Sequence, residues 1–211
     1  TSTRLLMHFN GTDGSTTFLD SSPNNWTTTA FATSQLSTSV VKFGSASLSL
    51  PSSSCYIQLP YQVGNFDTQD FCVEFWVYPI TRTAYGGIFA WNTNFTGFAL
   101  QWNNDNTLRL LVGDATATGW TRATQSVLTV ASNVWTHLAV TRQANLIRLF
   151  INGVEALTVT LAGVVFPDTT SAVNIGRFNG INFGIGYMDE VRVKVGNAIY
   201  TSNFTPPTSP F

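Results

Sequence analysis

Residues 135–161 read WTHLAVTRQANLIRLFINGVEALTVTL, and this stretch decides the fold class. The Asn152-Gly153 pair separates two runs rich in Val, Ile, Leu, Thr and Phe, which are residues favoured in β-strands. Both central residues of a type I′ turn need a positive φ, which Asn and Gly tolerate best. The polar link Gln143-Ala144-Asn145 has the length of a hairpin loop. We therefore predict three consecutive antiparallel strands and an all-β chain.

Shorter runs of strand type continue on both sides of this stretch. We expect strands over residues 5–9, 43–50, 56–59, 71–78, 88–91, 98–102, 108–112, 172–175 and 183–195. Residues 71–78 are apolar at nearly every position apart from Glu74, which predicts a central strand covered on both faces. Residues 114–132 are less regular and predict one or two short strands around Trp120 and Val127. The tail, residues 201–211, holds three prolines and is expected to lie flat on the surface without pairing.

This series of short strands, without a linker between them, predicts one two-sheet antiparallel β-sandwich of the jelly-roll type over residues 1–211. Hydrophobic residues make up 44% of the chain and charged residues only 10%, so a large core and a neutral polar surface are expected. Such a surface is typical of an extracellular or virion protein. The ten Lys and Arg residues are scattered and the net charge is −1, which argues against nucleic-acid binding. No apolar run approaches the roughly 18 residues that a membrane span requires.

Two features leave alternatives open. Cys55 and Cys72 each lie in an expected strand, and they form either a disulfide, if those strands pair, or two buried free thiols. The chain opens at Thr1 without Met or a signal-peptide pattern, which suggests a mature product or a fragment of a longer protein.

A series of motifs resembles those of the laminin-G-like, concanavalin A-like jelly-roll domains over nearly the whole chain. Their order and spacing carry the resemblance, and they are 5–15 (LLMHFNGTDGS) with 20–22 (DSS), 42–48 (KFGSASL), 70–77 (DFCVEFWV), 135–142 (WTHLAVTR), 150–153 (FING), 186–193 (GYMDEVRV) and 200–207 (YTSNFTPP). The first and last motifs are most similar to versions in tail and other structural proteins of bacteriophages. The resemblance implies a virion protein that contacts carbohydrate on the host surface.

The carboxylates do not form a catalytic pattern. Jelly-roll glucanases place two or three carboxylates on alternate residues of one strand, because acid and nucleophile must flank the glycosidic bond. Glu74 stands alone between apolar neighbours, and the adjacent Asp189 and Glu190 point to opposite faces of a strand. His8 and His137 lie within apolar strands, and we expect His137 to be a hydrogen-bonding residue of the core. We expect that the protein is not an enzyme.

A structural calcium site is one hypothesis. Ca²⁺ takes six to eight oxygen ligands, often carboxylates together with main-chain carbonyls. The resemblance implies that the loop of Asp20, the turn at residues 42–44 and Asp189 come together. Alternatively, Asp20 caps a turn and Asp189 accepts hydrogen bonds from backbone amides.

The carbohydrate hypothesis depends on aromatic and amide side chains close together. Sugar rings stack on Trp or Tyr, and their hydroxyls bond to Asn, Asp and Gln. Two strand ends offer this mixture, with the candidates Trp91, Asn92, Asn94, Trp102, Asn104 and Asp105. Further loop candidates are Trp26, Tyr85, Trp120 and residues 179–183. The alternative is that the tryptophans fill the core and the asparagines only turn the chain. Low charge suggests a neutral, hydroxyl-rich ligand.

We therefore predict a non-catalytic binding and structural module of a phage virion that contacts a host cell-surface glycan. It is expected as a homo-oligomer or multicopy component among other virion proteins. The alternatives are a purely structural virion protein, such as a capsid decoration or tail protein, and a carbohydrate-binding module of a secreted bacterial protein.

Overall fold

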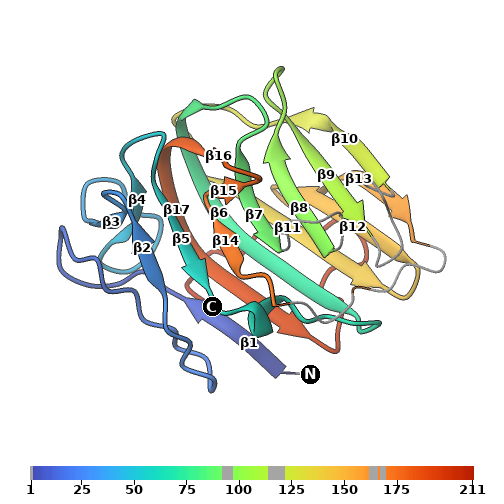
Figure 1. Cartoon of the computed structure of the whole chain (residues 1–211). Helices are drawn as coiled ribbons and strands as arrows, with labels where there is room; N and C mark the ends of the chain where they lie inside the picture. The colour runs from blue at the N-terminus through green and yellow to red at the C-terminus, as the bar shows by residue number, and fades with distance from the viewer. Residues whose placement is uncertain (1, 92–96, 114–121, 162–165, 167–169) are drawn as a thin grey trace.

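The computed structural model describes residues 2–91, 97–113, 122–161, 166 and 170–211. They form two large antiparallel sheets that enclose one hydrophobic core, to which both sheets contribute (Figure 1). The predicted all-β sandwich is thus confirmed. Within the described residues, no helix is long and apolar enough to cross a membrane.

Sheet A has eight strands. In spatial order they are β13 (Val154–Thr160), β12 (Leu146–Ile151), β11 (Thr136–Gln143), β6 (Phe71–Arg82), β17 (Gly184–Val195), β4 (Ser47–Leu50) and β3 (Gln35–Ser37), and β1 (Ser2–Met7) also pairs with β17. The longest strands, β6 and β17, lie side by side and bring residues near the end of the chain to the middle of the sheet.

Sheet B has seven strands, and a small hairpin lies beside it. The order is β10 (Arg122–Thr129), β9 (Thr107–Gly113), β8 (Gly97–Trp102), β7 (Gly87–Trp91), β14 (Val173–Ile175), β5 (Tyr56–Leu59) and β2 (Thr29–Phe31). The hairpin consists of β15 (Arg177–Phe178) and β16 (Ile181–Asn182), and a single 3₁₀ turn, η1 (Tyr61–Gly64), follows β5.

The predicted meander is confirmed as β11, β12 and β13. Ile151 pairs with Val154, so Asn152 and Gly153 form a two-residue loop, and their φ values of 49° and 75° are both positive, as the type I′ turn requires. The first loop is shorter than expected, because Gln143 already pairs with Leu146.

Strand β6 is central and covered on both faces, as predicted. Phe71, Phe75 and the valines between and after them point into the core. Cys72, Glu74 and Trp76 alternate with these residues and are also buried. Cys72 and Cys55 are both free thiols, which decides between the two alternatives.

The tail covers the other face of sheet A. Residues 201–211 form no strand, which confirms the sequence prediction. The Phe204 ring stacks on Tyr200 with 3.5 Å between centroids and lies 5.3 Å from the Phe150 ring. The Phe204 amide donates to the Gly153 carbonyl at 2.9 Å, and the Phe211 amide donates to Glu190 at 3.0 Å, so the tail is held at both ends.

Under the tail, one buried carboxylate joins three strands. Glu74 accepts hydrogen bonds from Arg192 at 2.9 and 2.6 Å and from the Tyr200 hydroxyl at 2.9 Å, and Nε2 of His137 lies 3.3 Å from its Oε2. Burial alone would raise the pKa of Glu74, but the hydrogen bond from His137 and the charge of Arg192 outweigh it and lower the pKa. His137 is fully buried, as expected for a core residue.

Several short elements escaped the sequence analysis. Strands β2, β3, β15 and β16 have only two or three residues, too few to show a period. Strand β10 confirms the expected strand around Val127, whereas Trp120 lies outside the described residues.

A glycine pair tests how firmly the tail is anchored. Both Gly153 and Gly14 have φ near +75°, but a Cβ on Gly153 would overlap the Phe204 carbonyl oxygen, whereas one on Gly14 would meet nothing within 4 Å. Gly14→Ala should cost only the strain of the left-handed backbone, about 1–2 kcal/mol. Gly153→Ala should cost more, because the tail must also move. Urea unfolding measures both, and equal losses of stability would contradict this role of the tail.

The buried carboxylate should make the fold sensitive to acid. Because the pKa of Glu74 in the folded protein lies below its usual value of 4.5, its stabilisation is present above pH 4.5 and is lost as the pH falls through the folded pKa. Glu74→Gln should therefore cost about 3 kcal/mol or more at pH 7, because the amide removes the negative charge opposite Arg192 and one of the two acceptor oxygens. The difference from the parent should shrink at acid pH in urea unfolding. Glu155→Gln, at an exposed carboxylate, is the control. A Glu74→Gln deficit that does not change with pH would contradict the assignment.

Candidate functional site

The outer face of sheet B follows from strand alternation. Phe89 and Trp91 of β7 point into the core, so Ala90 between them points outward. Ala90 pairs with Ala99, which pairs with Leu111, and these residues form a small apolar cluster separate from the main core. Because the side chains of Ala90 and Ala99 are small, the outer face of sheet B is shallow at this point.

The β15–β16 hairpin lies beside β7 on this face of sheet B (Figure 1). Phe178 of β15 completes the apolar cluster with the alanines. A Cβ on Gly87 would overlap the backbone of Phe178, and one on Gly86 would overlap the Asn182 carbonyl. Two consecutive glycines therefore allow the hairpin backbone to lie directly against the strand.

The hairpin separates two hollows. The first, here called the Tyr85 hollow, has a volume of about 250 Å³ and is lined by Tyr85, Gln101, Arg109, Leu111, Phe178, Asn179 and Ile181. The second, the Tyr56 hollow, has about 230 Å³ and is lined by Tyr56, Gln58, Asn174, Arg177, Asn179 and Gly180. Asn179, at the tip of the hairpin, lines both.

Each hollow combines a tyrosine, a guanidinium and side-chain amides. In the Tyr85 hollow the phenol ring is 38% exposed, and the Arg109 guanidinium carbon lies 5.9 Å from its centroid. The Tyr85 hydroxyl accepts a hydrogen bond from Asn104 at 3.1 Å and still has its own proton to donate. This hollow therefore offers a ring face together with hydrogen-bonding groups.

The Tyr56 hollow has a more buried ring. Tyr56 stacks on Phe31 with 4.2 Å between centroids, and the Arg177 guanidinium carbon lies 4.6 Å from the Tyr56 ring. Gln58 donates to the side-chain carbonyl of Asn174 at 3.1 Å. This bond leaves the carbonyl oxygen of Gln58 and the amide group of Asn174 for a ligand.

The sequence candidates fall into separate places. Trp91 and Trp102 are fully buried, where they pack on Phe66 and Phe183, respectively. A buried indole offers no face to a sugar, so this part of the prediction needs correction: both rings belong to the core. Asn104 lies at the edge of the Tyr85 hollow. The other candidates are exposed Asp105, which bonds to Thr107 and Gln125, and Asn92 and Asn94, which lie outside the described residues.

Some of the further candidates lie close together. Tyr85 and the hairpin residues Asn179 and Ile181, far apart in the sequence, line the Tyr85 hollow. Trp26 lies elsewhere and donates its indole N–H to the Arg4 carbonyl at 2.8 Å. Sequence reasoning missed Gln101 and Arg109, although both alternate with core residues and could have been assigned to the outer face.

The two aspartates of the calcium hypothesis are occupied by hydrogen-bond donors. Asp20 accepts from the amides of Leu6, Ser22 and Trp26, each at 2.9 Å, and from the Ser22 hydroxyl at 2.7 Å. These are the contacts of the alternative reading, in which Asp20 organises a turn. Donor hydrogens surround both carboxylate oxygens, so this side chain does not fit a cation ligand.

Asp189 has a similar environment. It accepts from the amides of Lys42 and Phe43 at 3.0 and 3.1 Å and from the Glu190 amide at 2.9 Å. Burial raises the pKa of Asp189 to about 7, and the backbone hydrogen bonds act against this rise. Among the described residues, no group of three or more His, Cys, Asp or Glu side chains could hold a metal ion.

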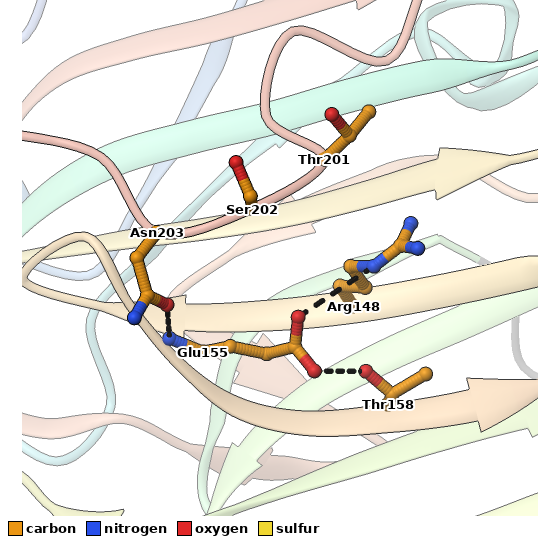
Figure 2. Close-up of a pocket in the computed structure, with 6 residues that line it drawn as sticks. All are labelled: Arg148, Glu155, Thr158, Thr201, Ser202 and Asn203. Carbon is orange, nitrogen blue, oxygen red and sulfur yellow. Dashed lines mark hydrogen bonds and ion pairs between the residues drawn. The ribbon is translucent and has the colours of Figure 1, made fainter.

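A wider, open hollow of about 650 Å³ lies on sheet A, where the β12–β13 hairpin meets the tail (Figure 2). Figure 2 shows Asn203, Arg148 and Thr158 around Glu155, whereas the side chains of Thr201 and Ser202 point away from it. The Asn203 side-chain carbonyl accepts from the Glu155 amide at 2.9 Å, and the Glu155 carboxylate accepts from Thr158 and lies 3.6 Å from Arg148. The bond to Asn203 holds the tail in place, and the other groups are bound to one another, which leaves fewer of them for a ligand than in the hollows of sheet B.

The aspartate contacts predict how the protein responds to calcium. Melting temperatures measured with added Ca²⁺ and with EDTA should be equal, because Asp20 and Asp189 are already saturated with donors. Asp20→Asn should cost about 1–3 kcal/mol, because the amide has one acceptor oxygen where the carboxylate had two. A rise in melting temperature with Ca²⁺ that Asp20→Asn abolishes would restore the calcium site.

Comparison with known proteins places this fold. A family model, Laminin_G_3, described as the concanavalin A-like lectin/glucanases superfamily, matches residues 51–195. No curated protein sequence matches the chain. Domain 4 of AbnA, a GH43 extracellular arabinanase from Geobacillus stearothermophilus solved with arabinotriose, is 21% identical, with a TM-score of 0.70 and 94% of both chains covered.

Two toxin structures have the same fold. The binding domain of Paraclostridial Mosquitocidal Protein 1 is 17% identical (TM-score 0.73), with 94% of this chain and 50% of that chain covered. The botulinum neurotoxin serotype D ligand-binding domain, solved with N-acetylneuraminic acid, is 15% identical (TM-score 0.67), with 97% and 48% covered. The chain thus spans about half the length of these toxin domains. The family match covers well over half of the chain, and the chain belongs to the concanavalin A-like lectin/glucanases superfamily in its Laminin_G_3 family.

Proposed function

We propose that this protein is a non-catalytic carbohydrate-binding module and that the outer face of sheet B, around the β15–β16 hairpin, holds the sugar. The observation that carries the proposal is the half-exposed ring of Tyr85 beside Gln101, Arg109 and Asn179. A sugar ring packs its C–H face on an aromatic ring and bonds its hydroxyls to amides and guanidinium groups.

The composition of the two hollows favours binding over hydrolysis. Their described lining residues include two arginines and no carboxylate. Glycoside hydrolysis by the usual mechanism needs a pair of carboxylates flanking the scissile bond. Glu74, the carboxylate in the middle of sheet A, is buried under the tail and paired with Arg192.

The comparisons support a sugar ligand. Domains of the same fold were solved with arabinotriose and with N-acetylneuraminic acid. Both belong to larger proteins, an extracellular enzyme in the first case and a toxin in the second, which supports an extracellular location for this module. The virion location, suggested by the motifs at the two ends of the chain, remains part of the proposal.

Two shallow hollows of this size should bind weakly, because they bury few ligand atoms. Adhesion to a cell would then need several copies on one particle, where a high effective concentration multiplies weak contacts. This argument favours a homo-oligomer or a repeated component over an isolated monomer.

The test is a glycan array followed by titration calorimetry on variants of Tyr85. Tyr85→Ala should weaken binding at least about tenfold, or ~1.4 kcal/mol, because the ring face is lost. Tyr85→Phe keeps the ring and should retain most of the affinity. Thr158→Ala, in the hollow of Figure 2, is the control on the other sheet. If Thr158→Ala weakens binding and Tyr85→Ala does not, the site lies on sheet A; binding to no glycan would favour the purely structural role.

A further inference from the structure

The guanidinium groups of Arg109 and Arg177 have no acceptor partner among the described residues. Each is half-buried in its hollow and contacts an aromatic ring, Tyr85 and Tyr56 respectively. Within the described part of the chain, neither makes a hydrogen bond or an ion pair. A guanidinium carries five N–H donors, and one that is partly withdrawn from water loses hydration that nothing in the protein replaces.

Other arginines of the chain are committed to the fold. Arg192 pairs with Glu74, and Arg148 lies beside Glu155. Arg82 donates to the Val130 carbonyl at 2.6 Å. The contrast separates guanidinium groups that bond to other parts of the protein from two that line open hollows and bond to none of the described residues.

In the described part of the chain, no acidic side chain forms an ion pair with either of these two arginines. The described lining residues of both hollows include no Asp or Glu. Asp105 lies near the Tyr85 hollow, but its carboxylate accepts from Thr107 and Gln125. Each hollow therefore presents a guanidinium that its described lining residues leave unneutralised, and Asp105, which keeps its negative charge, is not among the described lining residues of the Tyr85 hollow.

We infer that the sheet-B face selects saccharides that carry a carboxylate or a sulfate, with Arg109 and Arg177 as the groups that recognise the charge. The inference rests on the proposed function and specifies its ligand class. A guanidinium matches the two oxygens of such a group with parallel N–H donors, and the tyrosine ring beside each guanidinium restricts the orientations that it can take. The sequence-based expectation of a neutral ligand is thereby revised, because low overall charge does not describe the local charge of this face.

The tip of the hairpin connects the two positions. Asn179 lines both hollows. Arg109 is on β9, and the Tyr56 hollow lies over β14 and β5, three and four strands away in the sheet. At the usual strand spacing this separation is roughly 14–19 Å, so an oligosaccharide rather than a single sugar would be needed to contact both arginines.

The experiment compares matched acidic and neutral sugars. Tri-galacturonate is paired with its methyl ester, and lactose 3′-sulfate with lactose, so that each pair differs only in the acidic group. Calorimetry on the parent should show at least one acidic member binding about tenfold or more tighter than its neutral partner, as expected for a charge-assisted bidentate contact. Raising the salt concentration should reduce this preference.

Three variants assign the preference to the two arginines. Arg109→Gln and Arg177→Gln should each lower the affinity for the acidic sugar about tenfold while changing the neutral affinity about twofold or less. Arg148→Gln, which alters a paired arginine on sheet A, should change neither. Circular dichroism confirms that each variant is folded.

The outcomes separate this inference from the proposed function. Equal affinity for acidic and neutral partners, or a preference that survives both substitutions, overturns the inference while sugar binding stands. Binding of neutral sugars alone has the same meaning. If no member of either pair binds and the glycan array is also blank, both the inference and the proposed function fail.

Discussion

The two-residue period of a β-strand decides which side chains of this protein can meet a ligand. In sheet B every strand must give alternate residues to the core, because the two sheets share it. On β7 and β8 the core positions take Trp91, Phe98 and Trp102. The outer face then receives Ala90, Ala99 and Gln101 in between. Large rings inside and small or polar residues outside produce a stable sandwich with a low surface on which the β15–β16 hairpin can lie.

Sheet A uses the same alternation with the opposite result. Its outer face holds Glu74, His137 and Arg192, which are expensive to bury unless they are paired. Tyr200, which directly precedes the tail, is a further partner of Glu74, and Phe204 of the tail packs against His137. One face of the sandwich is therefore sealed by the chain itself, while the face of sheet B keeps two hollows. This asymmetry explains why we place the ligand on sheet B, although the hollow beside the tail is wider.

The β15–β16 hairpin adds charged and hydrogen-bonding side chains to the outer face of sheet B. Gly86 and Gly87 allow its backbone to lie against β7, and Phe178 packs on the cluster of Ala90 and Ala99. Its residues Arg177 and Asn179 then stand over side chains from four other strands. In a chain with only ten Lys and Arg residues, two unpaired guanidinium groups on one face are a concentrated feature. They add a preference for acidic groups to the sugar binding that we propose for this family member.

The sequence by itself determined the β class, the Asn152-Gly153 turn, the doubly covered strand of Glu74 and the unpaired tail. Each of these follows from local chemistry: turn conformation, residue period or the missing amide of proline. Only the tertiary structure decided the site. Tyr56 and Arg177 meet because β5 pairs with β14, and Tyr85 meets Asn179 because the hairpin lies against β7. The strands β14, β15 and β16 have two or three residues each, and such segments are stabilised by partners distant in the chain rather than by a pattern of their own. The sequence placed Trp91 and Trp102 at strand ends beside asparagines, and only the packing between the two sheets shows that both rings lie in the core.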